Sequence, residues 1–142
     1  MMDTKYFATP ADAENAFYRA FENSDLDIMM SVWLDADYVE CIHPMSHRLT
    51  GISEIRDAWV EIFHVTDNIK CETLEERCIE HNGLAIHTVV ENIIMDKGKR
   101  TVSILATNIY EKTPFGWRMI LHHASPAPKE FNDTDNPPPT MH

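Results

Sequence analysis

Two adjacent histidines, His122 and His123, lie in the apolar run GWRMILHHASP at residues 116–126. Histidine is the side chain that most readily gains or loses a proton near neutral pH. Neighbouring residues of a strand point to opposite faces, so the two imidazoles cannot enter one pocket unless the strand contains a bulge. The pair therefore predicts two separate sites, one on each face of a sheet.

A third histidine, His43, lies in the alternating segment DYVECIHP, which Pro44 ends and in which Cys41 and His43 share a face. If His43 and His123 face each other across a pocket, they can serve as general acid and base. The alternative is that each is a buried histidine bonded to a carbonyl or hydroxyl group. Cys41 and His43 also have the spacing of a thiol–imidazole pair, but no third group that orients the base is evident. No metal site is expected, because Glu40 and His43 point to opposite faces.

Three segments with helical periodicity precede most of the strands, at residues 8–25, 25–35 and 53–65. Thr9, Asp25 and Ser53 are the predicted N-caps of these helices. A short strand is expected at residues 37–44, and four longer ones at residues 69–80, 84–95, 100–112 and 116–125. Short turns, each with a glycine, join the four long strands, which predicts an antiparallel meander.

The chain has 142 residues and is 44% hydrophobic, which favours one compact domain. We expect an N-terminal segment at 1–10, a domain at 11–126 and a flexible, proline-rich tail at 127–142. The last three strands are apolar on both faces, so the helices are expected to cover one face and a second copy of the chain the other.

Composition also limits the partners and the compartment. A net charge of −11 argues against a nucleic-acid partner, because such proteins usually carry a basic surface. The sequence has neither a long apolar span nor a signal peptide, so we expect a cytoplasmic protein without a membrane partner. Three cysteines without C-x-x-C spacing predict neither a disulfide framework nor a cysteine zinc site.

Three stretches resemble a known family: FYRAFENSDLDIMMSVWLDADYVECIHP, LTGISEIRDAWVEIF and ATNIYEKTPFGWRMILHHASP. They are similar to the SnoaL-like branch of the nuclear transport factor 2-like (NTF2-like) superfamily, which includes ketosteroid-isomerase-like proteins. The resemblance runs from Ala11 to Pro126. It implies an α+β cone-shaped fold, in which N-terminal helices pack on a strongly curved, mostly antiparallel sheet around an apolar pocket. It also implies a homodimer formed through the outer face of the sheet.

Matching the strands to the family's pattern places Leu121, His123 and Ser125 inside the cone and His122 outside. His43 and His123 are then the implied catalytic pair. The implied substrate-binding residues are Phe17, Tyr18, Trp33, Cys41, Trp59, Asn92, Thr107 and Ser125. The residues implied at the dimer interface are Glu91, Asn108, Tyr110, Arg118 and His122. A single bulge would reverse any of these faces.

The catalytic residues of ketosteroid isomerases are not retained. That reaction uses a carboxylate base, with a tyrosine and a protonated carboxylic acid at the oxyanion. Here the base position falls on Cys41 or His43, the tyrosine position on Phe17 and the acid position on Thr107. A steroid-type double-bond shift is therefore not expected.

Three functions fit these features. The first is a cofactor-free acid–base enzyme of the isomerase, cyclase, dehydratase or hydrolase type, acting on a small, largely apolar substrate. The second is a binding module that holds an apolar ligand in the same pocket without turning it over. The third is a dimerisation domain with a vestigial cavity. No cofactor is expected for any of them.

Overall fold

The computed structural model describes residues 5–66 and 68–128, and within them the chain forms three α-helices, six strands and a short 3-10 helix. The helices are α1 (Pro10–Asn23), α2 (Leu26–Val32) and α3 (Ile52–Val65), with η1 at Asp96–Gly98. The strands are β1 (Glu40–Ile42), β2 (Arg48–Thr50), β3 (Lys70–His81), β4 (Leu84–Met95), β5 (Arg100–Thr113) and β6 (Gly116–Pro126). Most of the predicted proline-rich tail lies outside the described residues. Across the described ranges, no helix is long and apolar enough to cross a bilayer.

The first two helices begin at their predicted caps. Thr9 Oγ1 accepts a hydrogen bond from the first turn of α1 over 3.0 Å, and Asp25 Oδ1 does the same for α2 over 3.1 Å. Each bond satisfies one of the N–H groups that the first turn of a helix leaves unpaired. The prediction for α3 is wrong, because Gly51 rather than Ser53 is the N-cap. Its φ of 86° is a conformation that glycine adopts without steric cost.

The strands form one mixed sheet in the order β2-β1-β6-β5-β4-β3. The predicted meander from β3 to β6 is confirmed, since each neighbouring pair in it is antiparallel. In addition, β1 pairs in parallel with β6 and antiparallel with β2. The sequence pattern does not reveal β2, because three residues are too few to show an alternation.

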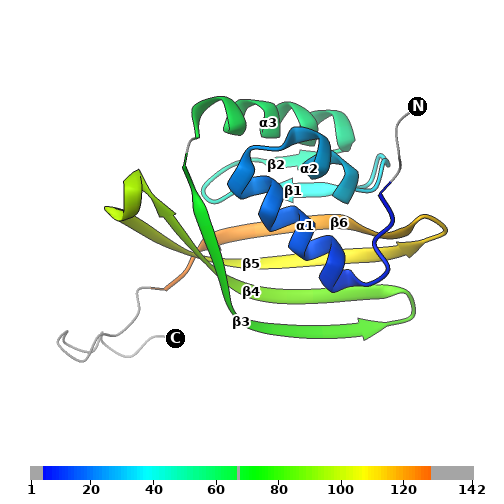
Figure 1. The fold of residues 1–142 in the computed structure, drawn as a ribbon. Coiled ribbons are helices and arrows are strands. Elements are labelled where there is room, and N and C mark those ends of the chain that lie inside the picture. The colour runs from blue at the N-terminus through cyan, green and yellow to red at the C-terminus, as the bar shows by residue number, and fades with distance from the viewer. Residues whose placement is uncertain (1–4, 67, 129–142) are drawn as a thin grey trace.

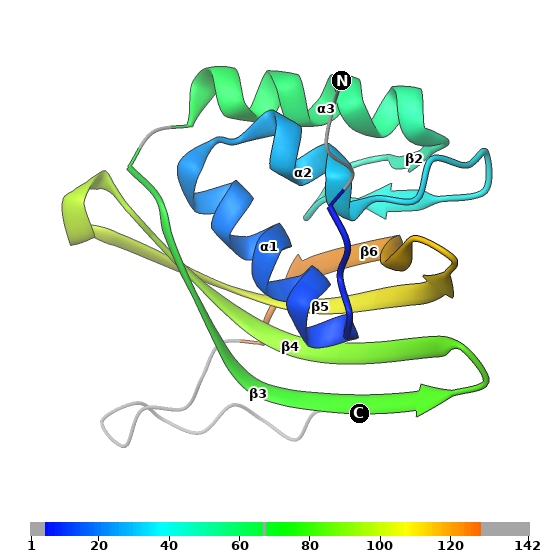
Figure 2. The same ribbon diagram turned by 45° about the vertical axis from the view of Figure 1, so that its right-hand side comes forward.

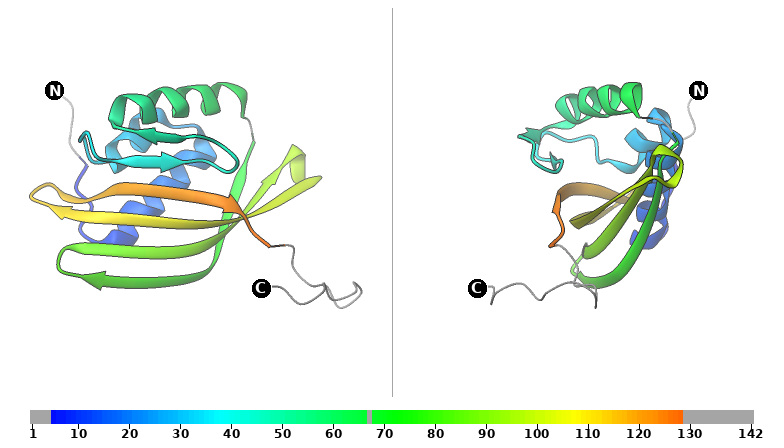
Figure 3. Two further views of the ribbon diagram at one scale, coloured as in Figure 1. Left: turned by 180° about the vertical axis from the view of Figure 1, so that it is seen from behind. Right: turned by 90° about the vertical axis from the view of Figure 1, so that its left-hand side faces the viewer.

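The helices lie on one side of the sheet. In Figures 1 and 2, α1 crosses the inner face of the meander, while α3 lies over β1 and β2. Figure 3 shows the sheet curving around α1, with no described helix on its outer face. The predicted α+β fold, with helices packed on a curved and mostly antiparallel sheet, is therefore confirmed.

The prediction of which sheet face meets the helices is wrong. The buried, inward side chains are Ala85, His87, Val89 and Glu91 of β4 and Ile104, Ala106, Asn108 and Tyr110 of β5. Two of the predicted same-face pairs are correct, since Thr107 pairs with His123 and Asn108 pairs with His122. Arg118 and Cys41 do not follow the prediction, because Arg118 pairs with Glu111 and Cys41 pairs with His122 rather than His123. However, the face that carries Asn108 and His122 points inward, and the face that carries Thr107 and His123 points outward.

A β-bulge in β6 explains this error. Ile109 pairs with Leu121, but the next residue of β5, Tyr110, pairs with Met119, so Ile120 is an extra residue. The alternation of faces therefore shifts by one, and both Met119 and His122 are buried on the inner face. Counting alternate residues forward from Met119 without the bulge puts Leu121 and His123 on the inner face, and so assigns the wrong face to the end of β6 and to its partners in β5.

Arg118 is buried by the N-terminal segment of its own chain rather than by a partner. Its guanidinium carbon lies 5.2 Å from the centre of the Phe7 ring, and it donates to the carbonyl oxygens of Lys5 and Trp117. Phe7 also forms a bridge with Gly116, where a Cβ would lie 2.8 Å from two Phe7 backbone atoms. The prediction of Arg118 as an interface residue is therefore not supported by its surroundings.

Candidate functional site

A cavity of about 230 Å³ lies between the helices and the inner face of the sheet. Its walls are Phe17, Tyr18, Phe21, His43, Pro44, Trp59, Ile62, Thr66, Ile69, Glu91, Ile93, Met95, His122 and Ala124. A dry cavity of about 150 Å³ is enough to hold one benzene molecule, so this one suits a molecule somewhat larger than a single ring. The few polar groups in these apolar walls are typical of a small-molecule site.

Glu91 is fixed in the cavity wall by Tyr18. The Tyr18 hydroxyl donates to Glu91 Oε2 over 2.6 Å and accepts a hydrogen bond from Asn108 Nδ2 over 2.9 Å. Within the described residues, Glu91 Oε1 has no hydrogen-bond partner, and the atom is not fully buried. Oε1 is therefore accessible, and Glu91 has one oxygen held by the protein and one available to a ligand.

Glu91 titrates near neutral pH. Burial raises the pKa of Glu91 to about 7; the hydrogen bond from Tyr18 partly opposes this rise, and the Glu14 carboxylate adds to it. Near that pH both protonation states are well populated. This is the property that a general acid or base needs in order to work at physiological pH.

His122 presents an unprotonated nitrogen. Its Nδ1 lies 2.6 Å from Asn108 Oδ1. Asn108 Nδ2 donates to both Tyr18 and Glu14, so Oδ1 is an acceptor and His122 Nδ1 must be the donor. Burial lowers the pKa of His122 to about 3, with smaller contributions from the two nearby imidazoles. His122 is therefore neutral at pH 7, and its Nε2 carries a lone pair.

His43 lies beside His122, with 6.2 Å between the ring centres, and its ring meets Trp59 edge-on at 4.9 Å. Cys41 Sγ is 3.5 Å from His43 Nε2. Burial raises the pKa of the Cys41 thiol well above its usual value, so the thiol stays protonated. The S–H group is therefore the hydrogen-bond donor and His43 Nε2 is the acceptor. Burial also lowers the pKa of His43 to about 4. The neutral ring therefore carries its proton on Nδ1.

Glu14 anchors the far end of this polar network. Its Oε2 accepts hydrogen bonds from Asn108 Nδ2 over 3.1 Å and from the Tyr110 hydroxyl over 3.0 Å, and lies 3.0 Å from His87 Nδ1. All four side chains are buried. Glu14 and Tyr18 are one turn apart on α1, so the same contacts that hold Glu14 fix the position of the Tyr18 hydroxyl.

The structure brings some of the predicted site residues together. Those that line the cavity as predicted are Phe17, Tyr18, His43 and Trp59. Trp33 and Cys41 are buried but lie outside its lining. Their predicted contact with substrate is therefore not supported by the geometry.

Other predicted site residues lie on the outer face. Thr107 pairs with His123 there, Ser125 is exposed, and Asn92 accepts a hydrogen bond from Ser103 over 2.8 Å. His123 is exposed, so it cannot face His43 across the cavity. The predicted pairing of His43 with His123 is thus wrong, because the bulge in β6 places His122 at the cavity instead.

The predicted dimer-interface residues are mostly buried within the chain itself. Glu91, Asn108, Tyr110 and His122 face α1 and form or support the cavity. Their placement on the outer face is wrong for the same reason. The sequence of α1 carries a signal of the correct face. Glu14 and Tyr18 interrupt the apolar face of this helix at helical spacing, so the sheet face that packs on it must supply polar partners.

A second, wider cleft of about 1160 Å³ adjoins the cavity, since both are lined by Thr66 and Ile69. Its lining includes Arg19, Lys70 and Lys97. Arg19 is paired with Glu22 over 2.8 Å. The cleft is open and contains none of the buried titratable groups described above, so we place the candidate site in the smaller cavity.

A family model of the SnoaL-like domain matches residues 11–129. Two solved structures agree. A Thiobacillus denitrificans protein, provisionally assigned as a calcium/calmodulin-dependent protein kinase type II association domain, is 38% identical with a TM-score of 0.79, over 87% of this chain and 99% of that one. A Streptomyces avermitilis protein of the NTF2-like family, provisionally assigned as a dehydratase, is 31% identical with a TM-score of 0.77, over 82% of this chain and 92% of that one.

Among curated proteins, F-box protein SKIP8 of Arabidopsis thaliana is 26% identical over 124 residues. The matched region is 85% of this chain but 52% of that protein, so the chain spans about half the length of this relative. The family match covers most of the chain, and the fold agrees with it. The chain therefore belongs to the SnoaL-like domain family of the NTF2-like superfamily.

Proposed function

We propose that this protein is a cofactor-free acid–base enzyme that acts on a small, largely apolar molecule in the cavity, with Glu91 as the group that moves the proton. The observation that carries the proposal is the state of Glu91. One of its oxygens is held by Tyr18, the other is accessible, and burial raises its pKa to about 7. A structural carboxylate would more often have both oxygens paired.

His43 and His122 have complementary roles in this proposal. Protonated Nδ1 of His43 is a donor suited to a carbonyl or developing oxyanion, whereas Nε2 of His122 is an acceptor. Both are neutral at pH 7, so neither competes with Glu91 for the proton. The substrate would lose a proton to Glu91 Oε1 while His43 donates to the oxygen on which negative charge develops.

The assignment of the Streptomyces avermitilis relative supports this class of reaction, because dehydration also requires removal of a proton by a base. The alternative is a binding module, in which the same groups only orient a ligand. These two functions differ in whether Glu91 exchanges a proton with the bound molecule.

We also propose that the protein forms a homodimer through the outer face of the sheet. Large apolar side chains are exposed there, among them Ile79 at 64%, Ile86 at 38% and Leu105 at 43%. Ile79 is the direct cross-strand partner of Ile86, so these side chains adjoin. The assignment of the Thiobacillus denitrificans relative as an association domain is consistent with such a surface.

The experiment uses a nitrobenzisoxazole as a probe of proton transfer. When a base removes the proton on the carbon of its isoxazole ring, the N–O bond breaks and a coloured cyanophenolate forms. We expect saturable turnover by the purified chain, with a rate that rises with pH through about 7. Glu91→Gln should lower kcat by about 10²–10⁴-fold, the usual contribution of a general base.

Glu72→Gln is the matched control, because this exposed carboxylate lies on the neighbouring strand opposite Asn92. It should leave turnover unchanged. Saturable binding of the probe without turnover would overturn catalysis in favour of the binding module. Turnover that survives in Glu91→Gln would remove Glu91 from the role of base.

A further inference from the structure

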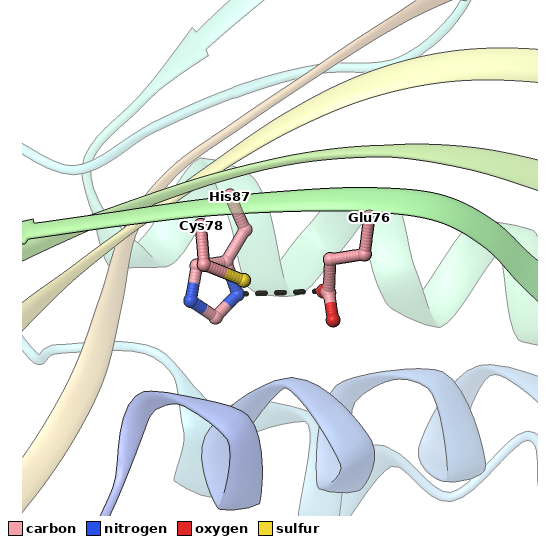
Figure 4. Close-up of side chains that lie close together, drawn as sticks. All are labelled: Glu76, Cys78 and His87. Carbon is pink, nitrogen blue, oxygen red and sulfur yellow. Dashed lines mark ion pairs between the residues drawn. The ribbon is translucent and has the colours of Figure 1, made fainter.

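A second group of reactive side chains lies outside the cavity, on β3 and β4. It consists of Glu76, Cys78 and His87, whose ligand atoms all lie within 4.8 Å of one another (Figure 4). Cys78 and His87 are direct cross-strand partners, so their side chains share a face. Glu76 and Cys78 are exposed, whereas His87 is buried. The group is therefore open to solvent on one side and anchored in the core on the other.

A bulge in β3 brings Glu76 to this face. Leu74 pairs with Val90 but Arg77 pairs with Thr88, so two residues of β3 lie opposite Val89. Glu75 in the bulge has a φ of 51°, a left-handed conformation that few residues other than glycine adopt. Bulges of this kind redirect side chains and are common next to functional sites. As a result, Glu76 Oε2 lies 3.5 Å from His87 Nδ1.

The donor types and spacing are those of a transition-metal site. We propose that Glu76, Cys78 and His87 form a binding site for a borderline-soft divalent cation, namely Zn²⁺. Ligand atoms bound to one tetrahedral zinc at about 2.0–2.3 Å are about 3.3–3.8 Å apart, which the 3.5 Å between Glu76 Oε2 and His87 Nδ1 already matches. A thiol and an imidazole favour zinc over magnesium or calcium, which prefer oxygen ligands.

Glu14 completes the surroundings of the site. Its Oε2 lies 3.0 Å from the same His87 nitrogen, on the buried side. Three protein ligands would leave a fourth position, which water or Glu14 can occupy. Two carboxylates beside one imidazole also give the site the negative charge that attracts a cation. Zinc bound to His87 Nδ1 would thus replace the hydrogen bond between this nitrogen and Glu14 Oε2.

The test is a titration of the untagged, chelator-treated full chain with Co²⁺ and then Zn²⁺. Cobalt bound to a thiolate gives a sulfur-to-metal charge-transfer band, and tetrahedral cobalt gives intense visible bands. We expect both with one cobalt per chain, their loss when zinc is added, and a rise in Tm with zinc. Cys78→Ser should remove the charge-transfer band, and Glu76→Gln should weaken zinc binding by at least about tenfold.

Cys71→Ser and Glu80→Gln are the matched controls on the same strand, since neither residue belongs to the cluster. Both controls should bind cobalt as the wild type does. Cys78 is exposed, so its replacement should leave the fold intact, which the Tm of the metal-free variant checks. Absence of the charge-transfer band in the wild type, its persistence in Cys78→Ser, or equal loss in Cys71→Ser would overturn the proposal.

Discussion

The Tyr18 hydroxyl and the Glu91 carboxylate lie 2.6 Å apart and join α1 to β4 inside the protein. Because Tyr18 already accepts a hydrogen bond from Asn108, its own proton points at Glu91. Burial and the nearby Glu91 carboxylate raise the pKa of Tyr18 well above its usual value, so the hydroxyl stays protonated. The contact therefore always stabilises the charged form of Glu91 and limits how far burial raises its pKa.

Tyr18→Phe is expected to raise the pKa of Glu91 above about 7. Within the described residues, the Tyr18 hydroxyl is the one hydrogen-bond donor to the Glu91 carboxylate, and the variant removes it. The midpoint of the pH–rate profile with the nitrobenzisoxazole should move to higher pH. The variant should also lose about 1–3 kcal/mol of stability, since Asn108 Nδ2 no longer has this acceptor. Stopped-flow kinetics and urea unfolding measure the two effects.

Tyr38→Phe controls for loss of a hydroxyl. Tyr38 is exposed and donates to Glu111 over 3.0 Å, away from the cavity. Its replacement should leave the midpoint where it is in the wild type. An unchanged or lowered midpoint in Tyr18→Phe would show that this hydroxyl does not set the protonation of Glu91.

Glu91 should make the protein less stable as the pH rises. The pKa of Glu91 is about 7 in the folded chain, against the ordinary glutamate value of 4.5 in the unfolded chain. Between these values the folded state binds more protons, so stability that is present below pH 4.5 is lost as the pH rises through 7. Between pH 4.5 and pH 8, the free energy of unfolding of Glu91→Gln should therefore increase relative to that of the wild type by on the order of 3 kcal/mol.

Urea unfolding at a series of pH values measures this difference. Glu80→Gln, at an exposed position of β3, should run parallel to the wild type. If the gap between Glu91→Gln and the wild type does not change with pH, the carboxyl is not buried in the way that the structure places it.

His122 should have the opposite effect. Its pKa is about 3 in the folded chain against 6.5 in the reference state, so the unfolded state binds the extra proton between these values. Its stabilising contribution is present above pH 6.5 and is lost as the pH falls toward 3. His122→Gln should therefore lose less stability on acidification than the wild type, by on the order of 3–5 kcal/mol.

The adjacent residue supplies a close control for this prediction. His123 is exposed on the other face of the same strand, so His123→Gln should follow the wild-type pH dependence. His43 titrates with the same sign as His122, since burial lowers its pKa to about 4. Equal responses of the His122 and His123 variants would mean that the bulge in β6 does not place His122 inside.

The elements could be predicted from sequence where local chemistry determines them. Thr9 and Asp25 cap their helices as expected, and glycines with positive φ, Gly83 and Gly116 among them, join the strands of the meander. These features depend on a few neighbouring residues and on steric limits that any chain shares. The resemblance to the family then supplied the arrangement of helices on the sheet.

The faces of the strands could not be predicted, because they depend on one extra residue. Ile120 and Leu121 are both apolar, so the sequence pattern is the same with or without a bulge between Met119 and His122. The register is decided by the buried polar network of Glu14 and Asn108. This network satisfies its hydrogen bonds only if the sheet face that carries Asn108 and His122 points toward α1. That network joins residues 94 positions apart and is not visible in a local pattern.

The outer face of the sheet should hold the proposed homodimer together. Leu105→Glu would place a charge among exposed apolar side chains at that interface, which is strongly unfavourable once water is excluded. We expect a dimer in the wild type and a monomer in the variant by light scattering after size exclusion. Val60→Glu on α3, at a site with 40% exposure, should leave the dimer unchanged. A wild-type monomer would contradict the proposed assembly.

Ala124 and Ala106 allow the cavity itself to be tested with one chemical change at two places. Ala124 lines the cavity, whereas Ala106 is fully buried and outside its lining. In Ala124→Val the two added methyl groups enter free space, so stability should change by less than about 1 kcal/mol while KM for the nitrobenzisoxazole rises at least about tenfold. In Ala106→Val the same groups meet packed neighbours, which should cost about 1–3 kcal/mol and leave KM unchanged.

Equal effects of the two substitutions on stability and on KM would mean that the cavity closes in solution. The substrate would then have to bind elsewhere, with the cleft beside Arg19 and Lys70 as the next place to examine. Because both variants add the same volume to the same inner face of the sheet, this comparison separates filling of the site from general overpacking of the core.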